Sequence, residues 1–198
     1  MCIRDREGAI CINPDYKAPK PKPAPIHVQL KPLGDLLASG EGDYDSVNRG
    51  RAGDTMQGFT ALTGKPLVQT TVREVMGMQR NWIYAVGRYQ FIPVTLRFAV
   101  SSSSVTPDDK MTPEVQDRLM AALILHKRPA IGGYLRGEHS SASWAVSELA
   151  REWASVEYRN GRGYYDWVGG NRAKISRHLA GKVLQKIKTS WQGSGSRP

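Results

Sequence analysis

Apolar positions first fall into a regular pattern after residue 32. The spacing i, i+3, i+4, i+7 and i+8, which places side chains on one face of a helix, is occupied by Leu33, Leu36, Leu37, Gly40 and Glu41. Glycine follows again at position 42, and a glycine after the last apolar turn is typical of a helix end. The pattern predicts a short helix that ends at Glu41, with this carboxyl group in the last core-facing position.

Capping residues and prolines predict further helix starts. Thr71-Val-Arg-Glu74 is a capping box, in which the threonine and the glutamate satisfy each other's backbone N–H groups. Proline fits the first turn of a helix, so we expect helices to begin at Pro93 and at Thr112-Pro113. The second of these helices is expected to end near Arg128-Pro129.

Apolar stripes at helical spacing predict which side chains of the later helices face the core. The helix after Thr112 presents Val115, Leu119, Ala122 and Leu123, and the next helix presents Ala142, Ala145, Val146, Leu149 and Trp153. The last helix, from about Arg172, presents Ile175, Leu179, Val183 and Ile187. We also interpret Trp82, Trp144 and Trp153 as core anchors.

Between Asp43 and Leu67 the chain is rich in glycine and has no helical period, so we expect loops with short strands or hairpins. Residues 84–92 read as a strand or a turn. Together these elements predict an α+β fold, mostly helical, with one small β-rich lobe near its start.

Proline density sets the predicted domain boundaries. Six prolines and four lysines lie between Asn13 and Pro32, which favours an extended, disordered linker over residues 1–32. One domain is expected over residues 33–189, followed by a flexible Gly/Ser-rich tail over 190–198. The opening residues do not form a signal peptide, and they read like a truncation or an assembly artefact, either of which would allow for a lost export signal.

The net charge of +10 is concentrated in the flanks of the chain. Residues 171–198 contain seven Lys/Arg and no acid, whereas residues 33–170 contain 15 charges of each sign. Basic flanks suit an anionic polymer or surface, such as nucleic acid, teichoic acid, lipopolysaccharide or membrane, and they equally suit a tail that only confers solubility.

Metal, cofactor and membrane chemistry are not indicated. The two cysteines, Cys2 and Cys11, are too few for a metal site or a disulfide framework, and the four histidines lack ligand spacing. Apolar runs fall far short of the roughly 20 residues of a transmembrane helix. We expect no metal, no cofactor and no transmembrane segment.

Glu41 is the residue whose position suggests chemistry. A carboxyl group on an apolar helix face loses solvation, which raises its pKa and lets it hold a proton near neutral pH, as a general acid must. The alternative is a glutamate at a helix end that bends into solvent, and spacing alone does not decide between the two.

Motifs further along the chain bear on that choice. Ser39-Gly-Glu41-Gly is followed by Gly87-Arg-Tyr-Gln-Phe91, then by Thr112-Pro-x-x-Gln116-Asp117, and then by Trp153-Ala-Ser155 and Gly163-Tyr-Tyr165. In this order the motifs, which span roughly residues 33–189, resemble the lysozyme-like superfamily. The similarity is greatest to the lambda-phage-type endolysins, which are lytic transglycosylases, and to related bacterial muramidases.

The resemblance implies a lysozyme-like fold with a substrate cleft between the lobes, and cleavage of the β-1,4 bond between N-acetylmuramic acid and N-acetylglucosamine. Glu41 takes the position of the family's catalytic glutamate. The residues that the resemblance places at the substrate are Asp45, Asn48, Tyr89, Gln90, Trp153 and Tyr165. Tyr165 and its aromatic neighbours suit stacking on sugar rings or packing between the lobes equally well.

The second catalytic group is open. Most glycosidases use two carboxylates, and Asp43, Asp45 and the Asp54-Thr55 pair are candidates on the loops after Glu41. Asp54-Thr55 resembles the acid and threonine of two-carboxylate phage lysozymes, but its spacing from Glu41 differs. Lambda-type enzymes act without a second acid, and we favour transglycosylation over hydrolysis.

Two other functions compete with this hypothesis. A non-catalytic module that binds peptidoglycan or another sugar would keep Gln90 and the aromatic residues but would not need Glu41. A basic nucleic-acid binder is suggested by the flanks, although residues 33–170 are neutral and contain no readout motif. We expect a monomer that acts on peptidoglycan in the periplasm or outside the cell, is phage-encoded or bacterial, contacts anionic envelope polymers through its flanks and binds no specific nucleic acid.

Overall fold

A computed structural model of the protein describes residues 2–5, 8–11, 23–50, 53, 58–168 and 171–194. Most of these residues are helical. The α-helices are α1 (Ile26–Gln29), α2 (Lys31–Glu41), α3 (Gly58–Thr63), α4 (Val72–Met78), α5 (Pro93–Ser101), α6 (Pro113–Ala122), α7 (Pro129–Arg136), α8 (Ala142–Glu152) and α9 (Arg177–Ser194). Two shorter helical segments are the 3₁₀ turn η2 (Leu67–Gln69) and the π-helical η3 (Leu123–Lys127).

The described strands are short and form antiparallel pairs. These pairs are β1 (Cys2–Asp5) with β2 (Gly8–Cys11), β3 (Val47–Asn48) with β4 (Ala85–Val86), and β5 (Glu157–Arg159) with β6 (Arg162–Gly163). The described part of the chain is therefore a mostly helical α+β structure, as the sequence predicts.

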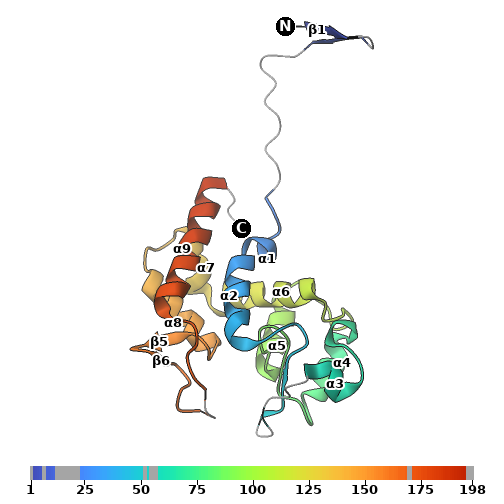
Figure 1. Ribbon diagram of the computed structural model, residues 1–198, viewed down its shortest axis with the longest axis vertical. Helices are drawn as coiled ribbons and strands as arrows, with labels where there is room; N and C mark the ends of the chain where they lie inside the picture. The colour runs from blue at the N-terminus through green and yellow to red at the C-terminus, as the bar shows by residue number, and fades with distance from the viewer. Residues whose placement is uncertain are drawn as a thin grey trace.

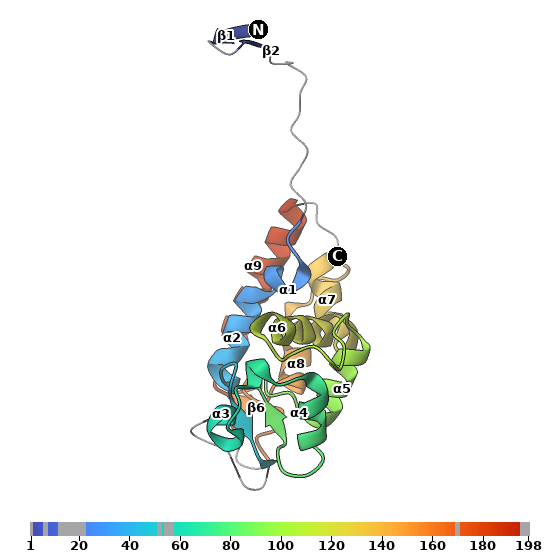
Figure 2. The same cartoon turned by 90° about the vertical axis from the view of Figure 1, so that its right-hand side faces the viewer.

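α2 is a central helix of the fold (Figure 1). Leu33 and Leu37 on its predicted apolar face are fully buried. Figures 1 and 2 both show α9 running beside α2, and both place α3 and α4 toward the end of the domain where α2 finishes. The core side chains of α2 thus fix its last residue, Glu41, at that end.

Helix starts follow the predicted capping chemistry. Thr71 accepts a hydrogen bond from the Glu74 N–H at 3.2 Å, and the Glu74 carboxylate accepts one from the Thr71 N–H at 2.6 Å. Thr112 caps α6 by accepting from the Val115 N–H at 3.3 Å, with Pro113 as the first helical residue. Both predicted starts are confirmed.

Within the predicted domain, 33–189, two α-helices are missing from the sequence-based prediction. α3 lies in the stretch predicted as loops and strands, and α7 begins at the proline at which the preceding helix was expected to stop. In α7 the proline occupies the first turn. A backbone N–H there has no acceptor within the helix, so the absence of this group in proline costs nothing. The same residue type therefore ends one helix and starts the next.

The last helix begins later than predicted, at Arg177, and its buried stripe differs from the expected one. Leu179 is 45% exposed, whereas the side chains that α9 buries are Ala180, Leu184, Ile187 and Trp191. Ile175 is buried but lies before the helix, in a parallel bridge with Val156. Four-residue spacing drifts around a helix of 3.6 residues per turn, so the straight stripe was wrong.

Two of the three predicted tryptophan anchors are not in the core. Trp82 is 44% and Trp144 is 52% exposed, whereas Trp153 is buried. Trp144 stacks instead on the ring of His139, with a centroid distance of 4.8 Å.

The predicted domain ends differ from the structure at both sides. α1 and the fully buried Leu30 lie inside the predicted linker, and residues 12–22 of that linker lie outside the described residues. α9 continues past the predicted boundary at residue 189, because the buried Trp191 anchors its end. Among the described helices, none combines the length and the apolar character needed to cross a bilayer.

Candidate active site

Glu41 is the last residue of α2, and its carboxylate meets the segment that follows α8. Ser155 donates two hydrogen bonds to the same oxygen, Oε1: one from its backbone N–H at 3.1 Å and one from its hydroxyl at 2.6 Å. Within the described residues no group donates a hydrogen bond to Oε2. The carboxyl group therefore has one held oxygen and one available oxygen.

Burial raises the pKa of Glu41 above its ordinary value. The hydrogen bonds from Ser155 and the positive charge of Lys174 act in the opposite direction, but the loss of solvation is the larger effect. The negative end of a helix dipole also disfavours a carboxylate at this position. The residue as a whole is half-buried, and protein atoms crowd its carboxyl group.

Gly40 makes the contact between Glu41 and Ser155 possible. A Cβ at position 40 would lie 2.5 Å from Ser155 Cβ and 3.1 Å from Ile175 Cδ1, which is too close for real atoms. The Lys174 ammonium group donates to the Gly40 carbonyl at 3.3 Å. The glycine before the glutamate thus lets α2 end directly against the Ser155 segment.

The Gly87–Gln90 turn after β4 is held by Gln116. Gly87 has φ +73°, and a Cβ there would lie 2.3 Å from Gln116 Oε1, so only glycine fits. The same Gln116 oxygen accepts from the Arg88 N–H at 2.9 Å, while its amide nitrogen donates to the Met111 carbonyl at 2.8 Å. Gln116 therefore has a structural role in this turn.

This turn lies beside the end of α2. A Cβ on Gly42, the residue after Glu41, would lie 3.8 Å from Gln90 Nε2. Gln90 has φ +47°, which is unusual for a residue other than glycine, and its amide donates to the Gly87 carbonyl at 3.0 Å. The structure therefore brings Glu41 and Gln90 into one neighbourhood.

Tyr89 supports the turn from the core side. Its ring is buried, its hydroxyl donates to Asp117 at 2.6 Å, and burial together with this bond raises its pKa. A Cβ on Gly34 of α2 would lie 2.6 Å from the Tyr89 hydroxyl oxygen. The hydroxyl expected to meet sugar is thus bound to Asp117 and packed against α2.

Arg88 also braces the turn. Its guanidinium group forms an ion pair with Asp35 of α2 and lies over the Tyr44 ring, 4.7 Å from the centroid. Arg88 thus connects the turn to α2 through the Asp35 carboxylate.

Asp45 and Asn48 are bound within the loop that follows Glu41. Asp45 Oδ1 accepts from the Leu67 N–H at 2.9 Å, and Oδ2 accepts from the Thr60 N–H at 2.8 Å. Asn48 pairs with a residue of β4, and its Oδ1 accepts from the Gly50 N–H at 2.6 Å. Both carboxylate oxygens of Asp45 therefore tie down the start of α3 and the turn η2.

Of the other candidates for a second acid, the structure describes Asp43 but not the Asp54-Thr55 pair. Asp43 Oδ1 accepts from the Asp45 N–H at 2.9 Å and from the Ser46 hydroxyl at 3.0 Å. Asp54 and Thr55 lie outside the described residues.

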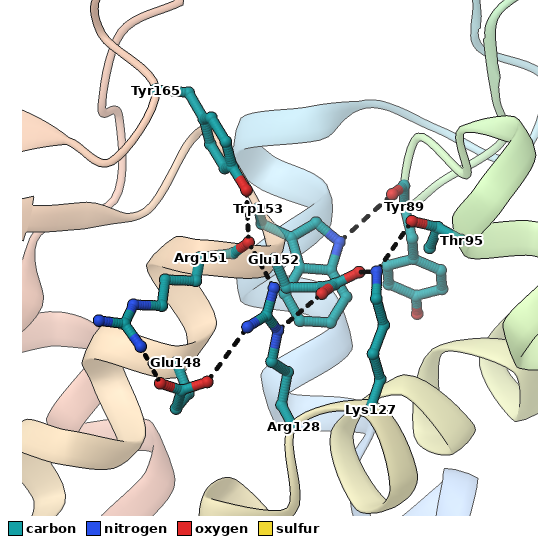
Figure 3. Close-up of polar contacts among 9 residues, drawn as sticks. All are labelled: Tyr89, Thr95, Lys127, Arg128, Glu148, Arg151, Glu152, Trp153 and Tyr165. Atoms are coloured by element: carbon teal, nitrogen blue, oxygen red, sulfur yellow. Dashed lines mark hydrogen bonds and ion pairs between the residues drawn. The ribbon is translucent and has the colours of Figure 1, made fainter.

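Trp153 and Tyr165 lie near the end of α8, close to Arg151 and Glu152 (Figure 3). The buried Trp153 donates its ring N–H to the Tyr89 carbonyl at 3.2 Å, which connects this end of α8 to the Gly87–Gln90 turn. Tyr165 donates its hydroxyl to the Arg151 carbonyl at 2.8 Å, and burial raises its pKa. Trp153 thus joins the parts of the site, and the half-buried Tyr165 braces the end of α8.

An ion-pair network lies next to Trp153 in Figure 3. Glu152, the last residue of α8, meets Lys127 at 2.6 Å and Arg128 at 2.8 Å, and its side chain is only 2% exposed. Arg128 also pairs with Glu148 at 3.2 Å. This network fixes the end of α8, from which the Ser155 segment leaves.

Sequence reasoning did not assign Ser155 and Lys174 to the site. Ser155 belongs to the Trp153-Ala-Ser motif, which was a signal of its importance but not of its partner, 114 positions earlier in the chain. Lys174 lies outside every motif, and only the fold brings it to Gly40.

A pocket of about 390 Å³ lies elsewhere, between α8 and α9, where its lining includes Val146, Arg177, His178 and Lys182. It does not include Glu41. In the described ranges, no three His, Cys, Asp or Glu side chains are grouped as metal ligands.

Comparison of the chain with family models, with curated proteins and with solved structures finds no match.

Proposed function

We propose that this protein is a peptidoglycan-cleaving enzyme in which Glu41 is the general acid. The observation that carries the proposal is the state of Glu41: its carboxyl group is crowded by protein, held by neutral donors and raised in pKa. The neighbouring Gly87–Gln90 turn, which motif order relates to the lysozyme-like superfamily, supports the same assignment. A lysozyme-like fold with a substrate cleft between the lobes is part of this proposal.

In the proposed reaction, Glu41 gives its proton to the oxygen of the β-1,4 glycosidic bond as the bond to the muramyl C1 breaks. The departing N-acetylglucosamine leaves as a neutral alcohol, and positive charge develops at the muramyl C1. A raised pKa favours the reaction because the acid must still carry its proton when the substrate binds.

The state of the described acids favours transglycosylation over hydrolysis. Two-carboxylate hydrolysis needs a second, free carboxylate, but Asp43 and Asp45 are both engaged by hydrogen bonds inside their own loop. Glu41, now a carboxylate, instead takes the proton of the muramyl 6-hydroxyl. That oxygen bonds to the muramyl C1 and closes an anhydro ring, and the proton taken from it leaves Glu41 protonated as at the start.

We assign substrate contact to Gln90 and positioning roles to Tyr89 and Trp153. Substrate contact by Asn48 and Tyr165 rests on the resemblance alone, because the structure bonds Asn48 Oδ1 to the Gly50 N–H and the Tyr165 hydroxyl to the Arg151 carbonyl. Tyr89 and Trp153 are buried, and their polar atoms are bonded to Asp117 and to the turn. Gln90 is half-buried and lies beside Gly42, so its amide group is placed to meet an acetamido group of the sugar.

Unpaired cations on and before α9 support contact with anionic polymers of the cell envelope. Among the described residues, no cation from Arg172 to Lys188 forms an ion pair, whereas every described ion pair lies within residues 31–152. Long-range attraction of this kind would bring the enzyme to the wall, from the periplasm or from outside the cell.

A zymogram with cell wall embedded in the gel tests the proposal. We expect clearing by the wild type, and a loss of at least about 100-fold for Glu41→Gln, because glutamine keeps the volume but has no proton to give. Glu114→Gln, at an exposed glutamate of α6, is the matched control and should clear like wild type. Wall binding without clearing by the wild type would instead identify a non-catalytic module, and near wild-type clearing by Glu41→Gln would exclude Glu41 as the acid.

A further inference from the structure

Ser155 gives both of its donors to one oxygen of Glu41. Its N–H and its hydroxyl reach Glu41 Oε1 at 3.1 and 2.6 Å. Two donors from one rigid position restrict the rotation of the carboxyl group about its last bond. The direction in which Oε2 points is therefore set by Ser155.

Ser155 is itself held firmly. Its carbonyl accepts hydrogen bonds from the N–H groups of Lys174 at 2.7 Å and Ile175 at 2.9 Å, and the residue is buried. Gly40 packs against it with no room for a Cβ. The donor pair thus has backbone support on one side and a tight helix contact on the other.

We propose that Ser155 is the positioning residue of Glu41, which assigns the acidic proton to Oε2 and fixes the direction of its transfer. This inference rests on the proposed function. In a neutral carboxyl group the carbonyl oxygen is the better acceptor, so an oxygen that accepts two hydrogen bonds is the carbonyl oxygen. The proton then lies on Oε2, the oxygen without a described donor.

The hydrogen bonds from Ser155 also matter when the proton leaves Glu41. The hydrogen bonds to Oε1 strengthen as negative charge develops on the carboxylate, because bonds to a charged acceptor are stronger than bonds to a neutral one. Burial raises the pKa of Glu41 and so favours its protonated form at the start, and Ser155 stabilises the product of the transfer. This explains why a buried acid is paired with neutral donors rather than with a cation.

Ser155→Ala tests the inference in the full chain. Removing the hydroxyl removes a bond that lowers the pKa of Glu41, so the carboxyl titration followed by ¹³C NMR should move to higher pH. The alkaline limb of the wall-lysis rate should move the same way, while the plateau rate falls by about tenfold through lost alignment. Ser155→Cys, which keeps the volume but is a much weaker donor, should behave like Ser155→Ala.

Two comparison variants separate positioning from other effects. Ser101→Ala, at an exposed serine at the end of α5, should change neither the titration nor the rate. Lys174→Gln should also raise the pKa of Glu41, because it removes a nearby positive charge, but it should lose less of the plateau rate since Oε1 stays bonded.

The result that would overturn the inference is a Ser155→Ala variant whose Glu41 titration and alkaline limb coincide with those of wild type. A plateau rate that stays at the wild-type level despite the pKa shift would remove the positioning role as well. Failure of the proposed function is distinguishable, because wild type would then show no lysis at any pH while the NMR titration still reports the contact.

Discussion

Two glutamates of this protein each end a helix, and the partners that surround their carboxyl groups differ in charge. Glu152 is the last residue of α8 and meets two cations, Lys127 and Arg128. Glu41 is the last residue of α2 and meets two donors of the neutral Ser155, which lies only three positions after Glu152. Both sit at the negative end of a helix dipole, where a carboxylate is disfavoured. Cations offset that cost at Glu152. Within the described residues no cation forms an ion pair with Glu41, on which Lys174 acts only through its nearby charge.

The comparison separates a structural acid from a chemical one. A buried carboxylate with two ion-pair partners serves as a clamp, because its charge is needed to hold them. A buried carboxyl group with neutral donors can gain and lose its proton without breaking an ion pair. Burial alone therefore does not identify a general acid, whereas burial with uncharged partners does suggest one.

Glu152→Gln should cause the largest loss of stability and should leave the chemistry in place. It leaves Lys127 and Arg128 without their shared carboxylate, and because these cations are 25% and 21% exposed, we expect a loss of about 2 kcal/mol in the free energy of unfolding. Denaturant unfolding measures this directly. The rate of wall lysis per folded molecule should stay within a few-fold of wild type. A large loss of this rate with unchanged stability would contradict the assignment of Glu152 as a structural residue and Glu41 as the general acid.

Gly40→Ala should disturb the contact between Glu41 and Ser155 through packing alone. The new Cβ meets Ser155 Cβ at 2.5 Å, so either α2 or the Ser155 segment must shift, at a cost of about 1 to 2 kcal/mol and with loss of lysis. Gly77→Ala in α4 is the matched control, since a Cβ there has nothing within 4 Å and alanine favours a helix by up to about 1 kcal/mol. If Gly40→Ala is as stable as Gly77→Ala and lyses cell wall at the wild-type rate, the close approach of Ser155 to Gly40 matters for neither stability nor activity.

The pH dependence of stability should show the smallest effect. Because the pKa of Glu41 is raised in the folded state, the folded protein binds this proton more tightly than the unfolded chain does. The residue's contribution to stability is complete below the pKa of an exposed glutamate, about 4.3, and is lost as the pH rises through the folded pKa. Glu41→Gln should therefore equal wild type in stability at acidic pH and exceed it at neutral pH.

Thermal unfolding of wild type and of Glu41→Gln, from acidic to neutral pH, measures this difference in stability. A stability gap that instead widens toward acidic pH has the wrong sign and would show that the folded state favours the carboxylate.

Local patterns predicted much of this structure. The end of α2 at Glu41, the two capped helix starts and the mostly helical α+β class follow from spacing and side-chain chemistry within a few residues. α7 and the stripe of α9 were missed because a proline can begin as well as end a helix, and because a straight four-residue stripe drifts off the buried face.

The site depends more on distant contacts. Spacing placed Glu41 on a core-facing position, and the turn beside it was found from motif order. Nothing local indicates that Ser155 reaches Glu41 or that Lys127 and Arg128 reach Glu152, since these partners are separated by 24 to 114 positions. Whether a glutamate is a clamp or an acid is decided by such partners, which only the fold reveals.

Mass spectrometry of purified peptidoglycan after digestion tests the central claim most directly. We predict that wild type releases muropeptides ending in anhydro-muramic acid and that Glu41→Gln releases none above background. Glycan strands left intact by wild type would contradict cleavage itself, and products with reducing ends would contradict ring closure by the muramyl hydroxyl.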